Sequence, residues 1–527
     1  MSAKATWKVS AAVMASRVLG LIRDQIFAAM FGYGVLTDCF NIAFRIPNLL
    51  RDLFAEGALS QAFVTTFSKR IKQTGPESAW PLARRMLTIM FLMMTAISLL
   101  GILFSPQLVH LLTAFGKEKT FSPDDVALMV KMTRIMWPFM LLVSLAALVM
   151  GVLNSRGVFG MPALSSCFFN IGSIVAGTGI GLWLDPNRGP MTMVGMAIGV
   201  VVGGFGQLAC QLPALHRLGF RWKPDWNWRD SDVAKIFSLM GPAVISASVV
   251  QINVVINSQF ATSIGKSAVS ALSGAFRLMQ LPIGVFGVAV ATVTLPALSL
   301  AATGSLGDEF RQTLSKGIRL VTFLVLPCAL GLCLLAGPII SAIFEMGRFS
   351  AANREITAAA LRGYGIGLLA YSWLKVLQPA FYAADRRWIP MMVSFLAIVL
   401  SVASNWYFVV VKGMGVEALA MTTSLVATTN FLILYVAMTR IAGGLESRSL
   451  MVLTAKLVAA SVPMAAVCLA ADHFLFDNPA KWPILIRATL VALTVGVAAG
   501  VYFTAARLLG IAEARETFAL ISRRLKR

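Results

Sequence analysis

Long runs of hydrophobic residues, separated by short polar connections, extend along almost the whole chain. A helix that spans a bilayer needs about 20 mostly apolar residues. By that length the pattern predicts about fourteen membrane helices, at residues 7–33, 36–67, 86–112, 126–154, 160–184, 191–215, 233–262, 268–301, 318–343, 356–384, 388–411, 415–439, 451–471 and 484–508. No connection between them is long enough to hold a soluble domain. The expected fold class is therefore an all-α, polytopic membrane protein.

The composition agrees with a membrane protein and argues against a nucleic-acid partner. Of the 527 residues, 58% are hydrophobic and 13% are charged, with a mean hydropathy of +0.79. A soluble protein carries about 25% charged residues. The net charge of +22 could suggest nucleic acid. However, the Lys and Arg residues gather in short loops between apolar runs, as cytoplasmic loops require, so we expect no nucleic-acid partner.

The distribution of Lys and Arg among the loops predicts the orientation. If the N-terminus is inside, the inner loops and tails carry more Lys and Arg than the outer loops. This asymmetry follows the positive-inside rule and predicts that both termini are cytoplasmic. The tail at 511–527 combines Arg515, Arg523 and Arg524 with apolar residues. It is typical of a basic amphipathic helix on anionic lipid, although a solvated tail remains an alternative.

An internal repeat predicts how the helices are grouped. Ala43-Phe44-Arg45 recurs as Ala275-Phe276-Arg277, 232 residues later, and Pro106 matches Pro338 at the same offset. Parallel repeats of six helices, related by an axis along the membrane normal, are a known transporter plan. We therefore predict two pseudo-symmetric six-helix lobes at 1–220 and 221–442, two added helices at 443–510, and the basic tail at 511–527.

Charged residues are concentrated in the first two predicted helices. This stretch contains Arg17, Arg23, Asp24, Asp38, Arg45, Arg51, Asp52 and Glu56. One such charge at the centre of a bilayer costs roughly 2.5–3.5 kcal/mol on insertion scales. At the repeat offset Arg17 and Arg51 correspond to the apolar Val249 and Ile283, and only Arg45 keeps a counterpart. A scaffold requirement would be expected in both halves, so the asymmetry indicates a ligand.

The spacing of these charges predicts a polar, mostly cationic cavity. On an ideal helix Asp38, Arg45 and Asp52 fall within about 40° of one another. Arginine is suited to forked binding of phosphate oxygens, so we expect an anionic, phosphorylated headgroup. The alternative is that the charges neutralise one another in buried salt bridges. The candidate substrate-binding residues are Arg17, Arg23, Arg51, Arg277, Asp38, Glu56, Arg45, Asn48 and Lys375.

Other motifs add little chemistry. The six cysteines and three histidines are scattered and make no metal cluster. We find no Walker sequence and no catalytic constellation, so we expect neither an enzyme nor a cofactor. Gly199-x-x-x-Gly203 and Gly496-x-x-x-Gly500 permit close helix packing.

Three stretches resemble a known family. They are SRVLGLIRD from Ser16, TDCFNIAFRIPNLLRDLFAEGALSQAFV from Thr37 and FRLMQLPIGVFGVAVATVTLPALS from Phe276, and KVLQPAFYAADRRWIP from Lys375 fits as well. The chain is similar along its full length to the MurJ (MviN) family of lipid II flippases, in the multidrug/oligosaccharidyl-lipid/polysaccharide exporter superfamily. The resemblance implies a bacterial inner-membrane protein that moves the undecaprenyl-diphosphate-linked peptidoglycan precursor to the periplasmic leaflet.

The resemblance also implies roles for particular residues. The family's cavity arginines map to Arg17, Arg23, Arg51 and Arg277, with Asp38 and Glu56 as accompanying acids, and the last two helices would form a groove for the lipid tail. Two departures concern ion coupling. Gln280 stands where some relatives have an acid, and residues 233–262 contain no acid that would hold a sodium ion. Coupling to a monovalent ion or to the membrane potential therefore stays open.

Three alternatives remain at this point. A flippase for another polyprenyl-linked glycan would have the same composition. A drug or cation antiporter of the same superfamily would require a cavity dominated by acids, whereas this one is rich in arginine. A membrane scaffold without transport activity would tolerate neutral replacements of Arg17 or Arg277. Expected partners are the lipid-linked precursor and membrane lipids, with other cell-wall synthesis proteins as further candidates.

Overall fold

The structure is a computed structural model that describes residues 3–52, 58–114, 120–302, 306–477 and 481–515. Throughout these ranges the regular secondary structure is helical. Ten of the described helices are long and apolar enough to cross a membrane. The prediction of an all-α, polytopic membrane protein is confirmed. Other long helices, α1 and α14 among them, carry charged residues along their length.

The contacts divide the chain into two units, Met1–Val269 and Ser270–Arg527. Before the boundary lie α1 (Ala3–Phe31), α2 (Val35–Arg51), α3 (Ala58–Thr74), the 3₁₀ turn η2 (Glu77–Ala79), α4 (Trp80–Thr113), α5 (Pro123–Ser155), α6 (Gly160–Leu184), α7 (Pro190–Ala209), α8 (Leu212–Arg217) and α9 (Ser231–Ile264). The boundary falls at the start of α10 (Ala268–Pro282). After it come the π-helical segment η3 (Ile283–Gly287), α11 (Val288–Ala301), α12 (Asp308–Leu334), α13 (Ala336–Phe344), α14 (Ala351–Ala383), α15 (Trp388–Asn405), the π-helical segment η4 (Trp406–Val411), α16 (Val416–Ile441), α17 (Ser447–Leu475) and α18 (Ile484–Leu508).

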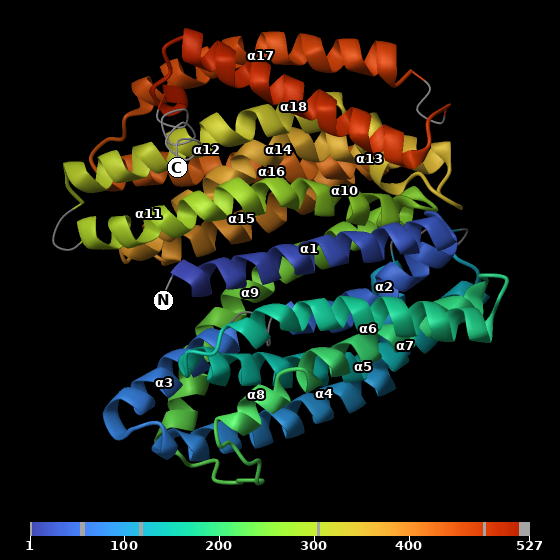
Figure 1. Ribbon diagram of the computed structural model, residues 1–527, viewed down its shortest axis with the longest axis vertical. Helices are drawn as coiled ribbons and strands as arrows, with labels where there is room; N and C mark the ends of the chain where they lie inside the picture. Colours follow the sequence, from blue (N-terminus) through green and yellow to red (C-terminus); the bar gives the residue numbers. More distant parts are fainter. Residues whose placement is uncertain (1–2, 53–57, 115–119, 303–305, 478–480, 516–527) are drawn as a thin grey trace. The chain divides into compact units, whose positions relative to one another are not determined.

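Corresponding helices pack in the same pairs within each unit. In the first unit α5 lies against α2, α4 and α7, and α6 lies along α7 (Figure 1). In the second unit α14 lies against α11, α12 and α16, and α15 lies along α16. α5 and α14 each begin with a capping box, at Ser122 and Ser350. This parallel supports the predicted internal repeat.

The contact boundary differs from the predicted lobe boundary between 220 and 221. The reason is that α9 packs against α3 and α4. The side-chain amide of Gln259 on α9 donates to the carbonyl of Leu111 on α4 at 2.7 Å. By its contacts α9 therefore belongs with the first unit, and the first unit extends to Val269. The predicted lobes rest on the sequence repeat and stay a prediction.

Helix interruptions occur at positions that hydropathy does not mark. The predicted helix 268–301 contains η3, which begins directly after Pro282. Proline has no N–H to donate, and short π-helical segments are a common way to accommodate such a disturbance. The predicted helix 318–343 begins earlier, at Asp308, and divides into α12 and α13 near Leu335. Pro47 lies inside α2 without ending it.

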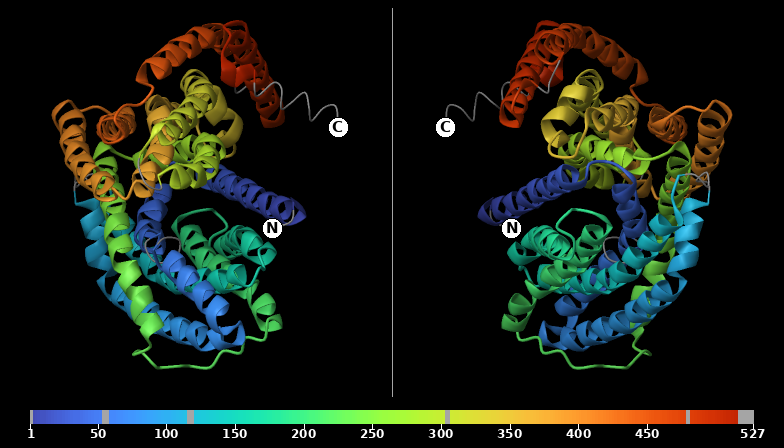
Figure 2. Two further views of the ribbon diagram at one scale, coloured as in Figure 1. Left: turned by 90° about the vertical axis from the view of Figure 1, so that its left-hand side faces the viewer. Right: turned by 90° about the vertical axis from the view of Figure 1, so that its right-hand side faces the viewer.

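The two last helices form a pair on the second unit. α17 and α18 pack against each other, α17 against α12, and α18 against α13 (Figure 2). The hydroxyl of the buried Tyr502 on α18 donates to the carbonyl of Phe323 on α12 at 2.8 Å. At the start of α18, Arg487 forms an ion pair with Glu345 at 3.3 Å. These contacts fix both ends of α18 to the helices of the second unit.

Close packing of α6 and α7 depends on glycine. A Cβ atom added to Gly199 would overlap the backbone of Gly177, and one added to Gly195 would overlap the backbone of Gly181. The first glycine motif, Gly199-x-x-x-Gly203, is thus a close helix contact, as predicted. The second is not, because a Cβ at Gly496 or Gly500 would meet nothing within 4 Å.

We predict that Gly199→Ala lowers the thermal stability of the purified protein. The added methyl group would force the two helices apart, and overpacking of this kind costs about 1–3 kcal/mol. The matched control is Gly179→Ala on α6, where an added Cβ would meet nothing within 4 Å. Melting temperatures in detergent measure the difference. Equal melting of the two variants would show that the α6–α7 contact tolerates the extra volume.

Candidate functional site

The first helix presents two arginines in different environments. α1 packs on α6, where the Asn170 side chain donates to the carbonyl of Ser16 at 3.2 Å. Arg17, next along the chain, is exposed. Arg23 is partly buried, with its guanidinium 3.3 Å from the Asp24 carboxylate and 5.6 Å from the centre of the Phe169 ring. Arg17 is therefore presented outward, whereas Arg23 is held against α6.

The second helix ends in a similar pair. Arg51, the last residue of α2, donates to the carboxylate of Asp52 at 2.8 Å. Both side chains are about one-quarter to one-third exposed. Arg45 and Asn48 lie earlier on α2 and are partly buried. Glu56, the remaining acid predicted for the site in this stretch, lies outside the described residues.

Asp38 has a backbone partner from a distant part of the chain. Its side chain is 0% exposed, and its carboxylate accepts the backbone N–H of Ser267 at 2.7 Å. The Ser267 hydroxyl donates to the carbonyl of Tyr33 at 2.8 Å. Ser267 has φ +73°, which a non-glycine residue seldom adopts. Asp38 therefore fixes the α9–α10 turn against the α1–α2 turn, while its predicted contact with substrate stays a prediction.

Two further candidate residues belong to the second unit. Arg277 lies on α10 and is exposed, a little over one turn before Pro282 and η3. Lys375 lies on α14 and is also exposed. η3 and α14 lie close together, because a Cβ at Gly287 would stand 3.4 Å from the Cα of Ser372. Since Arg277 and Lys375 are both exposed, each side chain is accessible to a ligand.

For the charges of the first two helices, the sequence predicted a cationic cavity, with mutual neutralisation in salt bridges as the alternative. The structure shows direct ion pairs at two of these arginines. The carboxylates of Asp24 and Asp52 each lie beside the arginine that precedes them. Both pairs are partly exposed to water, and ion pairs in contact with water contribute only about 0–1 kcal/mol. An anion that binds a guanidinium through two oxygens can compete with so weak a pair. The pairs are thus compatible with anion binding by Arg23 and Arg51.

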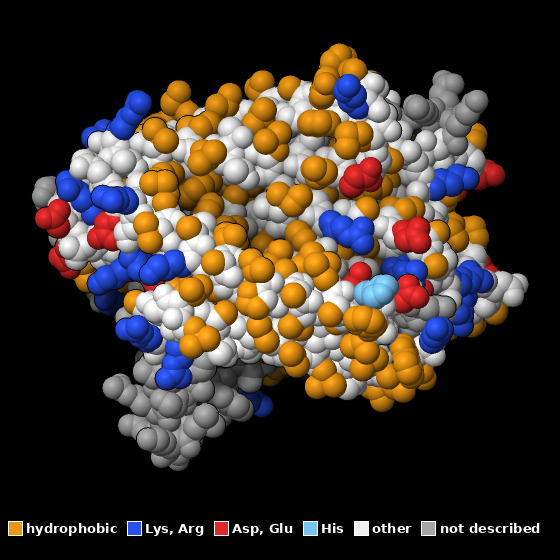
Figure 3. Space-filling view, turned by 90° about the horizontal axis from the view of Figure 1, so that it is seen from above, with side chains coloured by type: hydrophobic (Ala, Val, Ile, Leu, Met, Phe, Trp, Pro, Cys, Tyr) orange, Lys and Arg blue, Asp and Glu red, His pale blue; other side chains and the backbone are white. Residues whose placement is uncertain are grey.

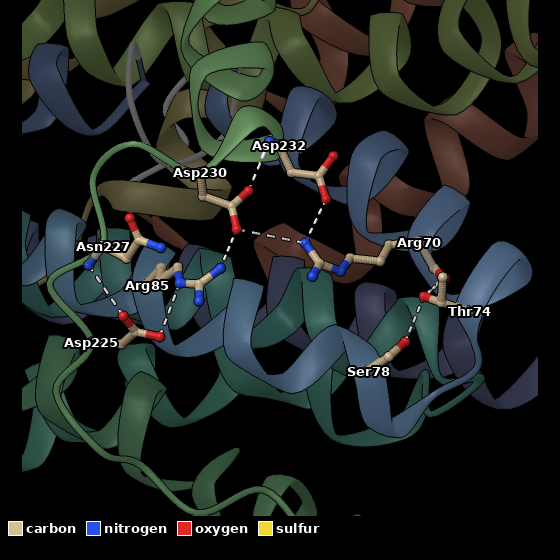
Figure 4. Close-up of polar contacts among 8 residues, drawn as sticks. All are labelled: Arg70, Thr74, Ser78, Arg85, Asp225, Asn227, Asp230 and Asp232. Atoms are coloured by element: carbon tan, nitrogen blue, oxygen red, sulfur yellow. Dashed lines mark hydrogen bonds and ion pairs between the residues drawn. The ribbon is translucent and has the colours of Figure 1, made fainter.

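Sequence reasoning missed a second polar network in the first unit. Arg70 on α3 forms an ion pair with Asp232 at 2.6 Å and lies 3.8 Å from Asp230 (Figure 4). Arg85 on α4 forms an ion pair with Asp225 at 2.9 Å and with Asp230. Asp230 also caps α9 by accepting the N–H of Asp232. The network joins the start of α9 to α3 and α4.

A signal for this network was present in the sequence. The acids of residues 225–232 and the basic residues of 69–85 fall in connections predicted on the same side of the membrane. Which acid pairs with which arginine could not be predicted without knowing that α9 packs on α3 and α4. With regard to metal ions, no group of three His, Cys, Asp or Glu residues in the described ranges could hold one.

The family model "Lipid II flippase MurJ" matches residues 27–481. The chain is 34% identical over 520 residues to "Probable lipid II flippase MurJ" of Vibrio cholerae, covering 95% of each chain. It is 34% identical over 441 residues to "Lipid II flippase MurJ" of Burkholderia cenocepacia, covering 82% of this chain and 83% of that one. The chain belongs to the lipid II flippase MurJ family.

Solved structures agree with this family at the level of fold. The structure described as "Lipid II flippase MurJ, inward closed conformation" has a TM-score of 0.75 at 23% identity, over 94% of this chain and 98% of that one. An inward-facing MATE multidrug transporter of the MOP superfamily has a TM-score of 0.66 at 14% identity, over 81% of this chain and 95% of that one. The fold is thus shared by the MurJ and MATE structures. Membership of the MurJ family, together with the ten apolar helices, indicates a multi-pass inner-membrane protein.

We predict that Asp38→Ala lowers the melting temperature. The substitution would leave the N–H of Ser267 without its buried acceptor, which costs about 1–3 kcal/mol. Asp38→Asn should retain much of the stability, because the amide oxygen can accept the same hydrogen bond. The control is Asp124→Ala, an exposed acid in the first turn of α5. If Asp38→Ala melted like the wild type but failed to support growth, Asp38 would act on the substrate and not on the turn.

Proposed function

We propose that this protein moves lipid II from the cytoplasmic to the periplasmic leaflet of the inner membrane. The observation that carries the proposal is the full-length likeness to the Vibrio cholerae protein named as a probable lipid II flippase, 34% identical over 95% of each chain. A likeness limited to the fold would not separate this function from drug export, because MATE transporters share the fold.

Two exposed arginines, Arg17 on α1 and Arg277 on α10, support the same cargo. Lipid II carries a diphosphate between its lipid and its sugars, and planar guanidinium groups bind phosphate oxygens through paired hydrogen bonds. Arg277 is exposed on α10, which has no other charged residue, and Arg17 is exposed on α1 between two uncharged stretches, 9–16 and 18–22. An arginine in that setting costs several kcal/mol unless water or an anion meets it. A diphosphate cargo accounts for its presence.

We propose that Arg17, Arg23, Arg51 and Arg277 bind the diphosphate in an inward-open state. Asp24 and Asp52, which lie beside Arg23 and Arg51 at 3.3 and 2.8 Å, would be displaced by the cargo and would pair again after its release. This exchange of partners keeps the two guanidiniums from being left uncompensated when the carrier returns empty. It also weakens the hold on the cargo, which release on the far side requires.

The prenyl tail needs a place that stays in the membrane. α17 and α18 have few charges and form a pair on the second unit. We propose that the groove beside them holds the tail during translocation. The membrane potential would favour the inward return of the cationic site, because moving one charge through 100 mV changes the free energy by about 2.3 kcal/mol. A monovalent ion remains a second candidate for coupling.

We predict that Arg17→Ala, Arg23→Ala and Arg277→Ala each abolish growth support in cells depleted of the native flippase, at normal membrane levels of the variant. Alanine removes both the charge and the paired hydrogen bonds to phosphate, whereas lysine keeps the charge and loses only the paired geometry. Arg17→Lys should therefore support growth at a level between alanine and the wild type. The control is Arg217→Ala, an exposed arginine at the end of α8. Full complementation by all three alanine variants would reject the arginine site.

We further propose that both termini are cytoplasmic, because the loops on that side are richer in Lys and Arg. Green fluorescent protein fused after Arg527 should be fluorescent, since it folds in the cytoplasm. Alkaline phosphatase at the same position should be inactive, because it requires the oxidising periplasm. The opposite pair of results would invert the proposed direction of every helix.

A further inference from the structure

A cavity of about 600 Å³ lies in the second unit where α17 begins and α18 has just ended. Its wall includes Arg319 from α12, Arg448 and Lys456 from α17, and Ile511 and Glu513 from the segment after α18. α18 ends in a turn at Gly510, with φ +70°, and the N–H of Ile511 donates to the carbonyl of Ala506 at 3.1 Å. This turn directs the following residues back toward α12 and closes one side of the cavity.

One of the three cations in the wall is already neutralised. Arg319 forms an ion pair with Glu513 at 2.7 Å and donates to the hydroxyl of Ser449 at 2.7 Å. This arrangement fixes the direction of its guanidinium and holds the segment after α18 in place. Arg319 and Glu513 together therefore build the cavity wall without adding net charge to it.

Among the residues that the structure describes, the other two cations have no such partner. Arg448 and Lys456 are both exposed, and neither forms a hydrogen bond or an ion pair within the described part of the chain. They lie eight residues apart on α17, which is about 12 Å along the helix axis and about 80° around it. Glu446 also borders the cavity. The exposed charge on this wall is thus net positive.

The position of Lys456 in the membrane makes its charge informative. It lies inside α17, which is long and apolar enough to span the bilayer. Between Arg448 and Lys456 the wall contains Ser449, whose hydroxyl is bonded to Arg319, and the apolar Val452 and Leu453, of which Val452 is exposed and Leu453 buried. On the face that carries α17 and α18, hydrophobic side chains cover the middle, and Lys and Arg gather most densely toward one end (Figure 3). A lysine inside an apolar membrane helix packs its aliphatic stem against apolar surface and extends its charge toward the polar headgroup region.

We propose that this cavity binds the phosphodiester headgroup of an anionic glycerophospholipid, with the acyl chains lying along the apolar surface of α17. Arg448 and Lys456 contact the phosphate, and the paired Arg319 and Glu513 shape the wall behind it. Basic pockets between membrane helices are a recognised setting for such headgroups. The site is separate from the proposed diphosphate site, and its occupant is a resident lipid, not the cargo.

The test uses the full chain in detergent, titrated with phosphatidylglycerol and followed by native mass spectrometry. The variant is Arg448→Gln/Lys456→Gln, and we expect its affinity for phosphatidylglycerol to fall about tenfold or more. The matched control is Arg217→Gln/Lys223→Gln, which removes two exposed cations, one at the end of α8 and one in the connection before α9. The control should bind like the wild type, and all forms should bind phosphatidylcholine weakly.

Several results would overturn the proposal. One is unchanged binding by the Arg448→Gln/Lys456→Gln variant, and another is an equal loss by the control, which would show only general charge attraction. Competition by sn-glycerol 3-phosphate at the affinity of the lipid would show a soluble phosphate site. If the double variant is unstable, the single variants Arg448→Gln and Lys456→Gln should each lose part of the affinity. No lipid II is present, so this result is independent of the proposed translocation.

Discussion

The cost of placing a guanidinium in a bilayer is the constraint on which the rest of this molecule depends. Arg17, Arg23, Arg45 and Arg51 lie on two helices that are otherwise built for lipid or for helix packing. Each would cost several kcal/mol if it met only hydrocarbon. Two of the four have an adjacent carboxylate within 3.3 Å. Such pairs reduce the cost of the empty site and are weak enough to yield to a diphosphate.

Much of the architecture could be predicted because membrane helices obey a simple length and polarity rule. The predicted spans 160–184 and 484–508 coincide with α6 and α18. Breaks inside spans were less predictable. Pro282 is followed by a π-helical segment, whereas Pro47 and Pro296 lie inside continuous helices. The outcome at a proline depends on which neighbouring groups donate a hydrogen bond to the freed carbonyl, and those neighbours come from other parts of the chain.

The candidate site shows the same limit. The arginines could be named from the sequence because their cost in the membrane is high wherever they point. The role of Asp38 could not, because its hydrogen-bond partner Ser267 is 229 residues away. Periodicity placed Asp38 on a stripe with Arg45, but burial against a distant turn decides what the carboxylate contacts. Likewise, two glycine motifs of identical spacing differ, since Gly199 faces another glycine and Gly496 faces open space.

The most direct test of the central claim is a measurement of which lipid accumulates, and on which leaflet, when this protein is removed. In cells depleted of it, the account predicts that the undecaprenyl-diphosphate-linked peptidoglycan precursor accumulates on the cytoplasmic leaflet, where an externally added precursor-cleaving enzyme cannot reach it. Re-expression of the wild type should restore access from outside. If the precursor still reached the periplasmic leaflet at the normal rate after depletion, the membrane arginines would not serve this cargo and the account would be wrong.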